Sequence, residues 1–269
     1  MKKITIKRKY LAFPYAVFML LFVILPLALI VFYAFTNADG SISLENFANF
    51  FTDGVAFNSF LDSIWIAFVT TLICFVVGFP VAYILANKKY NKNKTLFMLF
   101  LLPMWINFLL RTIATRAMFE AFGSWFNQEI TFGKATTIFG MVYNFLPFMI
   151  IPIYSTLTSL DKSYTEAALD LGATPTKVIT KVILPLALPG IISGITMVFM
   201  PTLSTFVISD LLGNNLVQLL GNIINLEFTQ NSWNYGSALS IILLLLMGIT
   251  MLIEKKYNSK NQTAGGRIW

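Results

Sequence analysis

The sequence predicts an all-α integral membrane protein with six transmembrane helices and with both termini in the cytoplasm. Three observations support this prediction: the composition, the length of the apolar runs and the distribution of the basic residues. Of the 269 residues, 57% are hydrophobic and 12% are charged, whereas about a quarter of the residues of a soluble domain are charged. So few charged side chains do not cover a water-facing surface, and we therefore expect the bilayer to be the solvent of this chain.

Six apolar runs are long enough to cross a membrane, because roughly 20 helical residues span a hydrocarbon core of about 30 Å. The predicted spans are residues 11–35, 63–86, 95–119, 136–157, 186–209 and 237–253. Together they form a single transmembrane permease domain over residues 1–269, with a cytoplasmic loop at 158–185. We find no soluble domain of useful size and no tandem repeat, so an energy source must come from other chains.

The first span follows a basic start, as the apolar part of a signal peptide does. Its apolar run is too long for a signal peptide, and no small-x-small cleavage site follows it. We therefore expect a retained membrane helix at residues 11–35.

Sixteen of the 19 Lys and Arg residues fall in segments that share one side of the membrane if the chain crosses it six times. These residues are Lys2, Lys3, Lys7, Arg8, Lys9, Lys88, Lys89, Lys92, Lys94, Lys162, Lys177, Lys181, Lys255, Lys256, Lys260 and Arg267. The loops on the opposite side hold Lys134 together with Asp39, Glu45, Asp53, Asp62, Glu120, Glu129, Asp210 and Glu227. Because basic loops stay in the cytoplasm, both termini are predicted there. The net charge of +7 is thus a topology signal, and no nucleic-acid partner is expected.

The sequence contains no histidine and a single cysteine, Cys74, within an apolar run. Without histidine the chain has no imidazole for acid–base catalysis, for metal ligation or for activating a nucleophile. No phosphate-binding loop of the G-x-x-x-x-G-K-[ST] type occurs in it either. We therefore predict a transport subunit rather than an enzyme, with no catalytic residue, no metal and no cofactor, and with Cys74 as a small buried hydrophobe.

The fourth loop contains the start and stop signals of two short helices outside the membrane. Ser163 and Glu166 have the spacing of a capping box, in which each side chain bonds a free backbone N–H of the first turn. Gly172 follows where a left-handed C-cap is expected. Thr174 and Pro175 then repeat the start signal, as a hydroxyl N-cap followed by proline at the first helical position. From these signals alone, a plain connection between two spans is as good an interpretation as a functional one.

The same loop resembles the cytoplasmic motif of ABC importer permeases, in which EAA is followed by glycine and then by Ile-x-Leu-Pro. The chain has Glu166-Ala167-Ala168, Gly172 and Val182-Ile183-Leu184-Pro185, with valine in place of the usual isoleucine. In that family the first loop helix is the coupling helix, which docks in a cleft of a cytoplasmic ATPase subunit. The resemblance implies the ABC importer type I permease fold. The coupling residues that it implies are Glu166, Ala167, Ala168, Leu169, Asp170, Gly172 and Pro185.

Two further stretches are similar to the permeases of spermidine/putrescine importers of the PotB type. They are LPMWINFLLRTIA at 102–114 and the segment 204–240, with its LLG, its GN-x-I run and its W-x-x-GSA-x-S entry to the last span. Two departures lie in the outer loop: Asn214-Asn215 replace common glycines, and Asn234 replaces a usual proline.

This resemblance implies half of the translocation channel of a binding-protein-dependent importer, a multi-pass protein of the bacterial inner or plasma membrane. The implied partners are cytoplasmic PotA-like ATPase subunits, a second, PotC-like permease and an extracytoplasmic PotD-like solute-binding protein. The implied cargo is a polyamine, spermidine or putrescine. A permease for another small solute is the alternative, because related permeases share much of this pattern.

A pathway for polyamines should offer carboxylates, aromatic faces and hydrogen-bond acceptors, since these cations alternate ammonium groups with apolar methylenes. The candidate pathway and gate residues are Trp105, Asn107, Arg111, Tyr143, Asn144, Pro201 and Asp210. Trp105 and Asn107 are expected inside the third span, and Tyr143 and Asn144 inside the fourth. The alternative for these side chains is helix packing, and for Pro201 a kink with no role in the pathway.

Arg111 is expected deep in the third span, where a cation needs a partner. A bare arginine would repel a polyamine. We therefore expect Arg111 to pair with Glu120, with Asp210 or with the second permease, and to organise the outer gate. Arg116 lies nearer the interface and is expected to reach it as an anchor.

Two other classes of protein fit less well. A self-contained secondary transporter is disfavoured by the absence of an internal repeat and of a carboxylate in the middle of the membrane. A membrane enzyme is disfavoured because no clustered acids, histidines or cysteine pairs supply a catalytic group.

Overall fold

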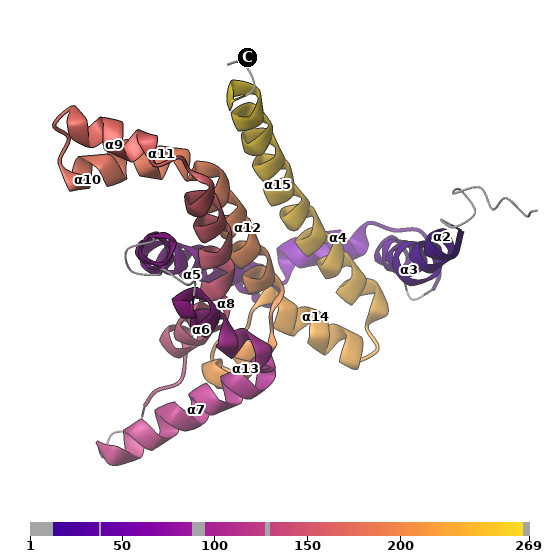
Figure 1. Ribbon diagram of the computed structural model, residues 1–269. Coiled ribbons are helices and arrows are strands. Elements are labelled where there is room, and N and C mark those ends of the chain that lie inside the picture. The colour runs from indigo at the N-terminus through magenta and orange to yellow at the C-terminus, as the bar shows by residue number, and fades with distance from the viewer. Residues whose placement is uncertain (1–12, 38, 88–94, 127–129, 266–269) are drawn as a thin grey trace, which may run out of the picture. The chain divides into compact units, whose positions relative to one another are not determined.

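The computed structural model describes residues 13–37, 39–87, 95–126 and 130–265, and side chains as far as residue 256 (Figure 1). In this part of the chain the structure is helical, apart from an isolated antiparallel bridge between Thr36 and Ile42. Two compact units make up the chain. The first consists of Met1–Phe57 and Ile223–Leu245, and the second of Asn58–Asn222 and Leu246–Trp269.

The helices follow one another along the chain with short connections, and three of the segments depart from α geometry. In order they are α2 (Phe13–Met19), the π-helical η1 (Leu20–Ile24), α3 (Leu25–Ala34), α4 (Glu45–Thr52), α5 (Gly54–Ala86), α6 (Thr95–Leu101), the 3₁₀-helical η2 (Leu102–Trp105), α7 (Phe108–Trp125), α8 (Lys134–Ser159), α9 (Ser163–Asp170), α10 (Pro175–Val178), the π-helical η3 (Ile179–Ile183), α11 (Leu184–Leu186), α12 (Leu188–Ser204), α13 (Val207–Gly213), α14 (Leu220–Thr229) and α15 (Trp233–Gly265).

Within the described residues, four helical segments are long and apolar enough to cross a membrane: Phe13–Ala34, Gly54–Ala86, Lys134–Ser159 and Trp233–Lys256. The number rises to six if two bent pairs each count as one span. Thr95–Trp105 and Phe108–Trp125 meet at 90°, and Pro175–Leu186 and Leu188–Ser204 meet at 69°. The predicted run at 95–119 is therefore not a straight helix. The run at 186–209 begins at the second bend and is interrupted at 205–206, between α12 and α13.

The predicted third span, at 95–119, is broken in the structure, and Pro103 is the residue expected to interrupt it. The helix tightens to 3₁₀ geometry around Pro103, and Ile106 then adopts an extended conformation (φ −80°, ψ 135°). Asn107 restarts the helix, since its Oδ1 accepts a hydrogen bond from the backbone N–H of Leu109 at 2.8 Å. An asparagine that caps a helix in this way competes with continuous helix. Trp105 and Asn107 therefore lie at the break between the two helical segments.

In the first unit, asparagine side chains hold the end of α3. Asn46 of α4 donates from Nδ2 to the carbonyl oxygens of Ala34 and Thr36, at 3.3 and 3.0 Å. Asn234 of α15 also donates from Nδ2 to the carbonyl oxygen of Thr36, at 2.6 Å. Asn234 was one of the two departures from the family pattern. Where the family usually has proline, the side-chain amide of Asn234 supplies a hydrogen-bond donor that links the start of α15 to the end of α3.

In the second unit, α12 and α8 lie side by side (Figure 1). Two glycines of α12 make this contact close. A Cβ atom at Gly190 would lie 2.7 Å from the carbonyl oxygen of Pro152, and one at Gly194 would lie 2.8 Å from the sulfur of Met149. Small residues at such positions let membrane helices approach each other's backbone. Cys74 is fully buried in the core cluster that includes Met149, which confirms it as a buried hydrophobe.

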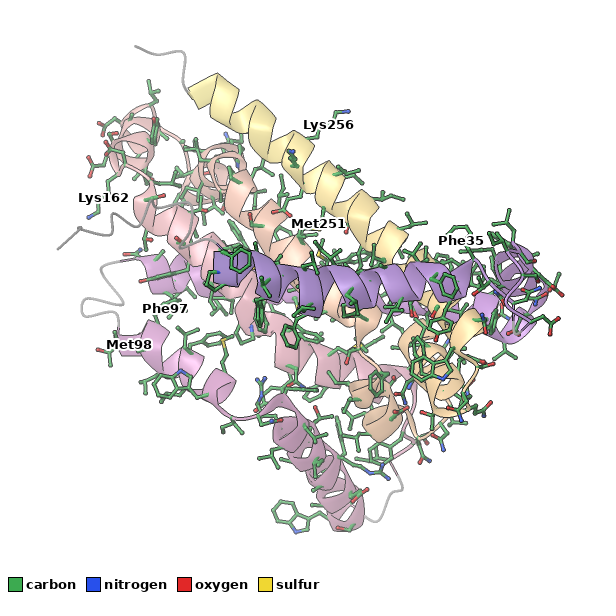
Figure 2. All side chains as sticks on the ribbon, turned by 90° about the vertical axis from the view of Figure 1, so that its right-hand side faces the viewer. Phe35, Phe97, Met98, Lys162, Met251 and Lys256 are labelled. Carbon is green, nitrogen blue, oxygen red and sulfur yellow. The ribbon has the colours of Figure 1, made fainter. Side chains whose placement is uncertain are left out.

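Large apolar side chains cover much of the surface that this chain presents by itself. None of the residues in the window of Phe13–Ala34 that passes as a span is buried, and Met251 of α15 is 58% exposed (Figure 2). Exposed apolar surface of this extent requires lipid or another protein as its neighbour.

Candidate functional site

The loop between α8 and α12 folds into a hairpin of α9 and α10, which we call the loop hairpin (residues 161–186; Figure 1). The hairpin begins at Asp161, next to Lys162, which is labelled in Figure 2. Asp161 starts α9: its Oδ1 accepts a hydrogen bond from the backbone N–H of Ser163 at 2.9 Å. This backbone bond, with a second bond from the Ser163 side chain, lowers the pKa of the Asp161 carboxyl below its ordinary value.

The predicted capping box between Ser163 and Glu166 does not form. The N-cap residue of α9 is Lys162, which makes no side-chain cap bond, and Ser163 already lies in the first helical turn. Asp161 explains the difference, because aspartate readily bonds the backbone N–H two residues further on. The helix starts where the sequence predicts, but another side chain starts it.

The predicted end of α9 is confirmed in detail. Gly172 has φ +77°, the left-handed conformation that favours glycine. Its N–H donates to the carbonyl oxygen of Leu169 at 2.9 Å, and the N–H of Ala173 donates to that of Ala168 at 3.0 Å. These two bonds are those of a Schellman motif, which closes the helix and reverses the chain.

The second helix of the hairpin starts at Pro175, as predicted, but the hydroxyl of Thr174 makes no cap bond. Beyond Val178 the helix widens into the π segment η3, where the N–H of Leu184 donates to the carbonyl oxygen of Ile179. Pro185 has no N–H with which to continue the α series, which accounts for a wider turn just before it. The segment η1 stands in the same relation to Leu25-Pro26.

The faces of α9 differ in burial. Ala168 packs against the core of the second unit, while the other motif residues at 166, 167, 169, 170, 172 and 185 are exposed. Apolar side chains stand among them on the exposed side: Tyr164, Leu169 and Leu171 are exposed, and Leu171 is 89% exposed. The hairpin thus presents leucines and acids outward from a tightly closed turn.

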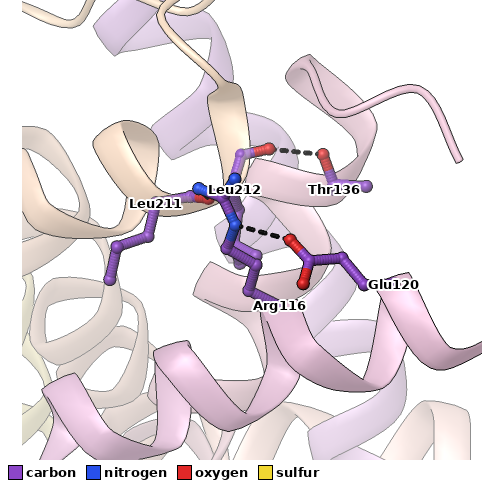
Figure 3. A network of polar contacts seen from close by, with 5 residues as sticks. All are labelled: Arg116, Glu120, Thr136, Leu211 and Leu212. Carbon is purple, nitrogen blue, oxygen red and sulfur yellow. Dashed lines mark hydrogen bonds and ion pairs between the residues drawn. The ribbon is translucent and has the colours of Figure 1, made fainter.

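A second polar region lies where α7, α8 and α13 meet, and its ion pair differs from the one expected (Figure 3). Glu120 pairs with Arg116 rather than with Arg111: Arg116 Nε lies 2.9 Å from Glu120 Oε1. Arg116 Nη1 donates to the carbonyl oxygen of Leu211 at 2.9 Å. The four-residue spacing on α7 brings Arg116 and Glu120 together. Arg116 therefore joins α7 to α13 and is more than an interfacial anchor.

Asp210, the other expected partner of Arg111, accepts a hydrogen bond from Asn222 Nδ2 instead. Burial raises the pKa of the Asp210 carboxyl, and the Asn222 bond opposes this rise. The Asn222 side chain also accepts hydrogen bonds from the Ser209 hydroxyl at 2.8 Å and from the Leu219 N–H at 2.9 Å. Our sequence reasoning missed Asn222 as an organising residue, although it belongs to the quoted GN-x-I run.

Arg111 is 8% exposed, and its Nε and Nη1 have no hydrogen-bond partner. The guanidinium carbon lies 5.9 Å from the centroid of the Tyr143 ring, a cation–π contact. Asn144, beside Tyr143, donates to Thr112 Oγ1 at 3.2 Å, but its own Oδ1 is buried without a partner. The structure thus gathers Arg111, Tyr143 and Asn144 into one group with unsatisfied hydrogen-bonding capacity.

The remaining candidate pathway residues do not join this group. Trp105 is 87% exposed in the break of the third span, and Asn107 caps α7. Pro201 lies inside α12, where its carbonyl oxygen accepts a hydrogen bond from the N–H of Thr205 at the end of the helix. A second pair that the sequence did not predict joins Lys134 Nζ to Asp62 Oδ1 at 2.7 Å.

Comparisons with known proteins agree on one group. Residues 78–260 match the family model described as "Binding-protein-dependent transport system inner membrane component". The "Spermidine/putrescine transport system permease protein PotB" of Escherichia coli (strain K12) is 34% identical over 253 residues, which are 87% of this chain and 92% of the relative. The protein of the same name from Haemophilus influenzae is also 34% identical, over 89% of this chain and 90% of its own length.

Among solved structures, the chain resembles one from the "bacterial ABC transporter involved in the import of the acidic polysaccharide alginate". The TM-score is 0.76, with 16% identity, over 94% of this chain and 96% of that one. At this identity the likeness concerns the fold, which is that of an ABC importer permease.

Proposed function

Since this chain belongs to the family of binding-protein-dependent transport system inner membrane components, we propose that it forms half of the channel of an ATP-driven importer. The observation that carries the proposal is the 34% identity to the E. coli PotB permease across most of both chains. The loop hairpin supports it independently, because its closed turn and exposed leucines suit a docking contact with a separate ATPase.

The proposed cargo is a polyamine, spermidine or putrescine. Relatives from E. coli and H. influenzae bear that cargo in their names, and the resemblance extends over nearly their whole length. An importer for another small solute is the alternative, and a panel of solutes distinguishes the two.

The loop hairpin is the proposed contact with the ATPase. A contact that transmits force must be stiff, and the Schellman turn at Gly172 fixes the angle between α9 and α10. Leu169 and Leu171 offer apolar surface for burial, and Glu166 and Asp170 offer charge for specificity. In the proposed orientation this hairpin and both termini face the cytoplasm, in accordance with the lysine distribution.

We place the partner of Arg111 on the second permease. Within the described part of this chain, Glu120 and Asp210 are engaged by Arg116 and Asn222, so neither meets the expectation of an internal pair. A carboxylate or backbone carbonyl from the other half of the channel would satisfy the buried guanidinium. Arg111 is then a residue of the channel's central interface, held in place by the Tyr143 ring.

The test is reconstitution of the chain with its neighbouring transport genes: an ATPase, a second permease and a binding protein. We expect ATP-dependent uptake of spermidine or putrescine into proteoliposomes that requires all four components. If the complex took up another solute in an ATP-driven manner and took up no polyamine, the importer proposal would stand and the polyamine proposal would be wrong. Uptake by this chain without any ATPase would overturn the importer proposal itself.

A further inference from the structure

A hollow of about 310 Å³ lies in the first unit, where α4 ends, α5 begins and α15 begins. It is lined by Asn49, Thr52, Asp53 and Tyr235. All four residues belong to the same compact unit, and they fall on the side that the lysine distribution predicts to be outside.

The hollow presents acceptors more than donors. Asp53 Oδ1 accepts the N–H of Val55 at 2.9 Å, and its Oδ2 accepts the hydroxyl of Tyr235 at 3.0 Å. The hydroxyl proton of Thr52 is donated to the carbonyl oxygen of Asn49 at 3.1 Å. Each carboxylate oxygen keeps a lone pair, and both hydroxyl oxygens have given away their only proton. A ligand that suits this lining is rich in N–H donors.

Among the described residues of the first unit, the charged side chains have a single sign. Its described residues, 13–37, 39–57 and 223–245, contain four carboxylates and no lysine or arginine. The carboxylates are Asp39, Glu45, Asp53 and Glu227. Glu227 lies close to the hollow, because a Cβ atom at Gly236, next to Tyr235, would lie 3.2 Å from the Glu227 Cβ. Such a surface concentrates cations and repels anions.

The lining fits an organic cation better than a metal ion. Among the described residues no group of three or more Asp, Glu, His or Cys side chains is placed to hold a metal. A primary ammonium carries three donors and no acceptor, which matches one carboxylate with hydroxyl and amide oxygens around it. The ring of Tyr235 adds an aromatic surface, to which cations are attracted.

We propose that this hollow binds one primary ammonium group of an organic polycation on the outer side of the membrane, before the cargo enters the channel. Asp53 supplies the charge, and Tyr235, Thr52 and Asn49 supply the remaining acceptors. The proposal rests on the proposed function for its cargo and its sidedness, whereas its chemistry rests on the hollow alone.

The hollow also has a matched pair of variants. Asp53→Asn removes the charge and keeps the start of α5, since asparagine caps helices about as well as aspartate. Asp39→Asn removes the same charge from an exposed turn of the same unit. In the complete importer we expect Asp53→Asn to raise the KM for spermidine about tenfold when free spermidine is supplied, whereas Asp39→Asn leaves it within about twofold.

A thiol reporter tests the site without relying on transport. Thr52→Cys is placed in a Cys74→Ala background within the assembled complex and treated with a cationic and an anionic methanethiosulfonate. We expect the cationic reagent to react faster, and the ratio of the two rates to fall about tenfold when Asp53→Asn is added, given one charge at about 6 Å in water. Spermidine and putrescine should slow the reaction only where Asp53 is present.

Each outcome of the reporter assay has a distinct meaning. Protection by spermidine that disappears with Asp53→Asn supports the site, even if the importer carries a different cargo in the uptake assay. No protection at millimolar spermidine in a complex that does import spermidine overturns the site and leaves the importer intact. Protection by the binding protein but not by free polyamine identifies a docking surface instead and also overturns the ammonium site.

Discussion

The loop hairpin and the broken third span are both pairs of helices joined by a sharp turn, but their polar groups are satisfied in different ways. In the hairpin, Asp161 and Gly172 close both ends of α9 through bonds within five residues. In the third span, Asn107 caps α7 locally, yet Arg111 one turn later has no hydrogen-bond partner for two buried nitrogens. The hairpin is therefore complete in the isolated chain, whereas the third span requires a neighbour.

The largest effect is expected from a substitution that disrupts the turn of the loop hairpin. Gly172→Val places a β-branched residue at φ +77°, at a cost of roughly 1–3 kcal/mol in local strain. We expect ATP-driven uptake by the reconstituted importer to be abolished while the chain still inserts into the membrane.

Two controls sharpen this prediction. Gly172→Asn should retain most of the uptake, because asparagine tolerates the left-handed conformation. Gly248→Val, at a helical position with open space around it, should have little effect. Normal uptake by Gly172→Val would show that coupling does not depend on the conformation of the hairpin turn.

The next effect tests whether the third span is completed by another chain. Arg111→Met removes a buried cation that has no carboxylate partner within the described part of this chain, so we expect the thermal stability of the isolated chain to be unchanged or raised. The yield of complex with the second permease, measured by co-purification, should fall about tenfold, equivalent to about 1.4 kcal/mol.

Arg116→Met is the matched variant on the same helix. Its ion pair with Glu120 is partly exposed, and such pairs contribute about 0–1 kcal/mol. We expect a smaller loss of complex, about twofold, and a lower stability of the isolated chain. If Arg111→Met instead destabilised the isolated chain and left the complex intact, its partner would lie within this chain.

A smaller effect concerns the break itself. Asn107→Ala removes the acceptor for the Leu109 N–H and should cost about 1 kcal/mol. For a chain of this length, that loss lowers the unfolding temperature by about 2–4 °C. Asn107→Asp should restore it. An unchanged unfolding temperature in Asn107→Ala would show that the break does not depend on its cap.

The smallest effect is a pH dependence in the hairpin. The pKa of Asp161 is lowered in the folded state, so its stabilisation of α9 is complete above the ordinary value, about 3.9. It is lost as the pH falls through the lower, folded-state pKa. Hydrogen exchange of α9 amides should therefore accelerate in acid, and Asp161→Asn should remove much of that acceleration. Asp170→Asn serves as the control, and an equal loss there would contradict the role of Asp161.

The same two regions show which structural features can be predicted from the sequence and which cannot. The end of α9 and the start of α10 were predictable because Gly172 and Pro175 act through their own backbone. The side chain that caps the start of α9 was assigned to Ser163, whereas the structure has Asp161. An interruption of the third span was predictable from Pro103, but its place at Ile106 and the cap by Asn107 were not, since both residues lie in an apolar run. The pairing of Glu120 with Arg116 was predictable from their four-residue spacing on α7. The bond from Arg116 to the carbonyl oxygen of Leu211 was not, because it depends on how α7 meets α13.

Asn222 and the hollow around Asp53 were missed for a related reason. Asn222 bonds residues on both sides of a connection between helices, and Asp53 meets Tyr235 across 182 residues of sequence. Neither pairing leaves a periodic or a short-range pattern. Family resemblance indicates the fold, whereas these side-chain pairings depend on tertiary contacts that the sequence pattern does not specify.

The π-helical turn η3 affects the direction in which the loop hairpin points. A widened turn holds one residue more than an α-turn, and one residue corresponds to about 100° of rotation about a helix axis. Deleting a single residue within 179–183 would restore regular winding and rotate α9 about the axis of the segment Pro175–Leu186. The direction in which Leu171 points thus depends on the winding of η3, a turn that lies within the motif itself.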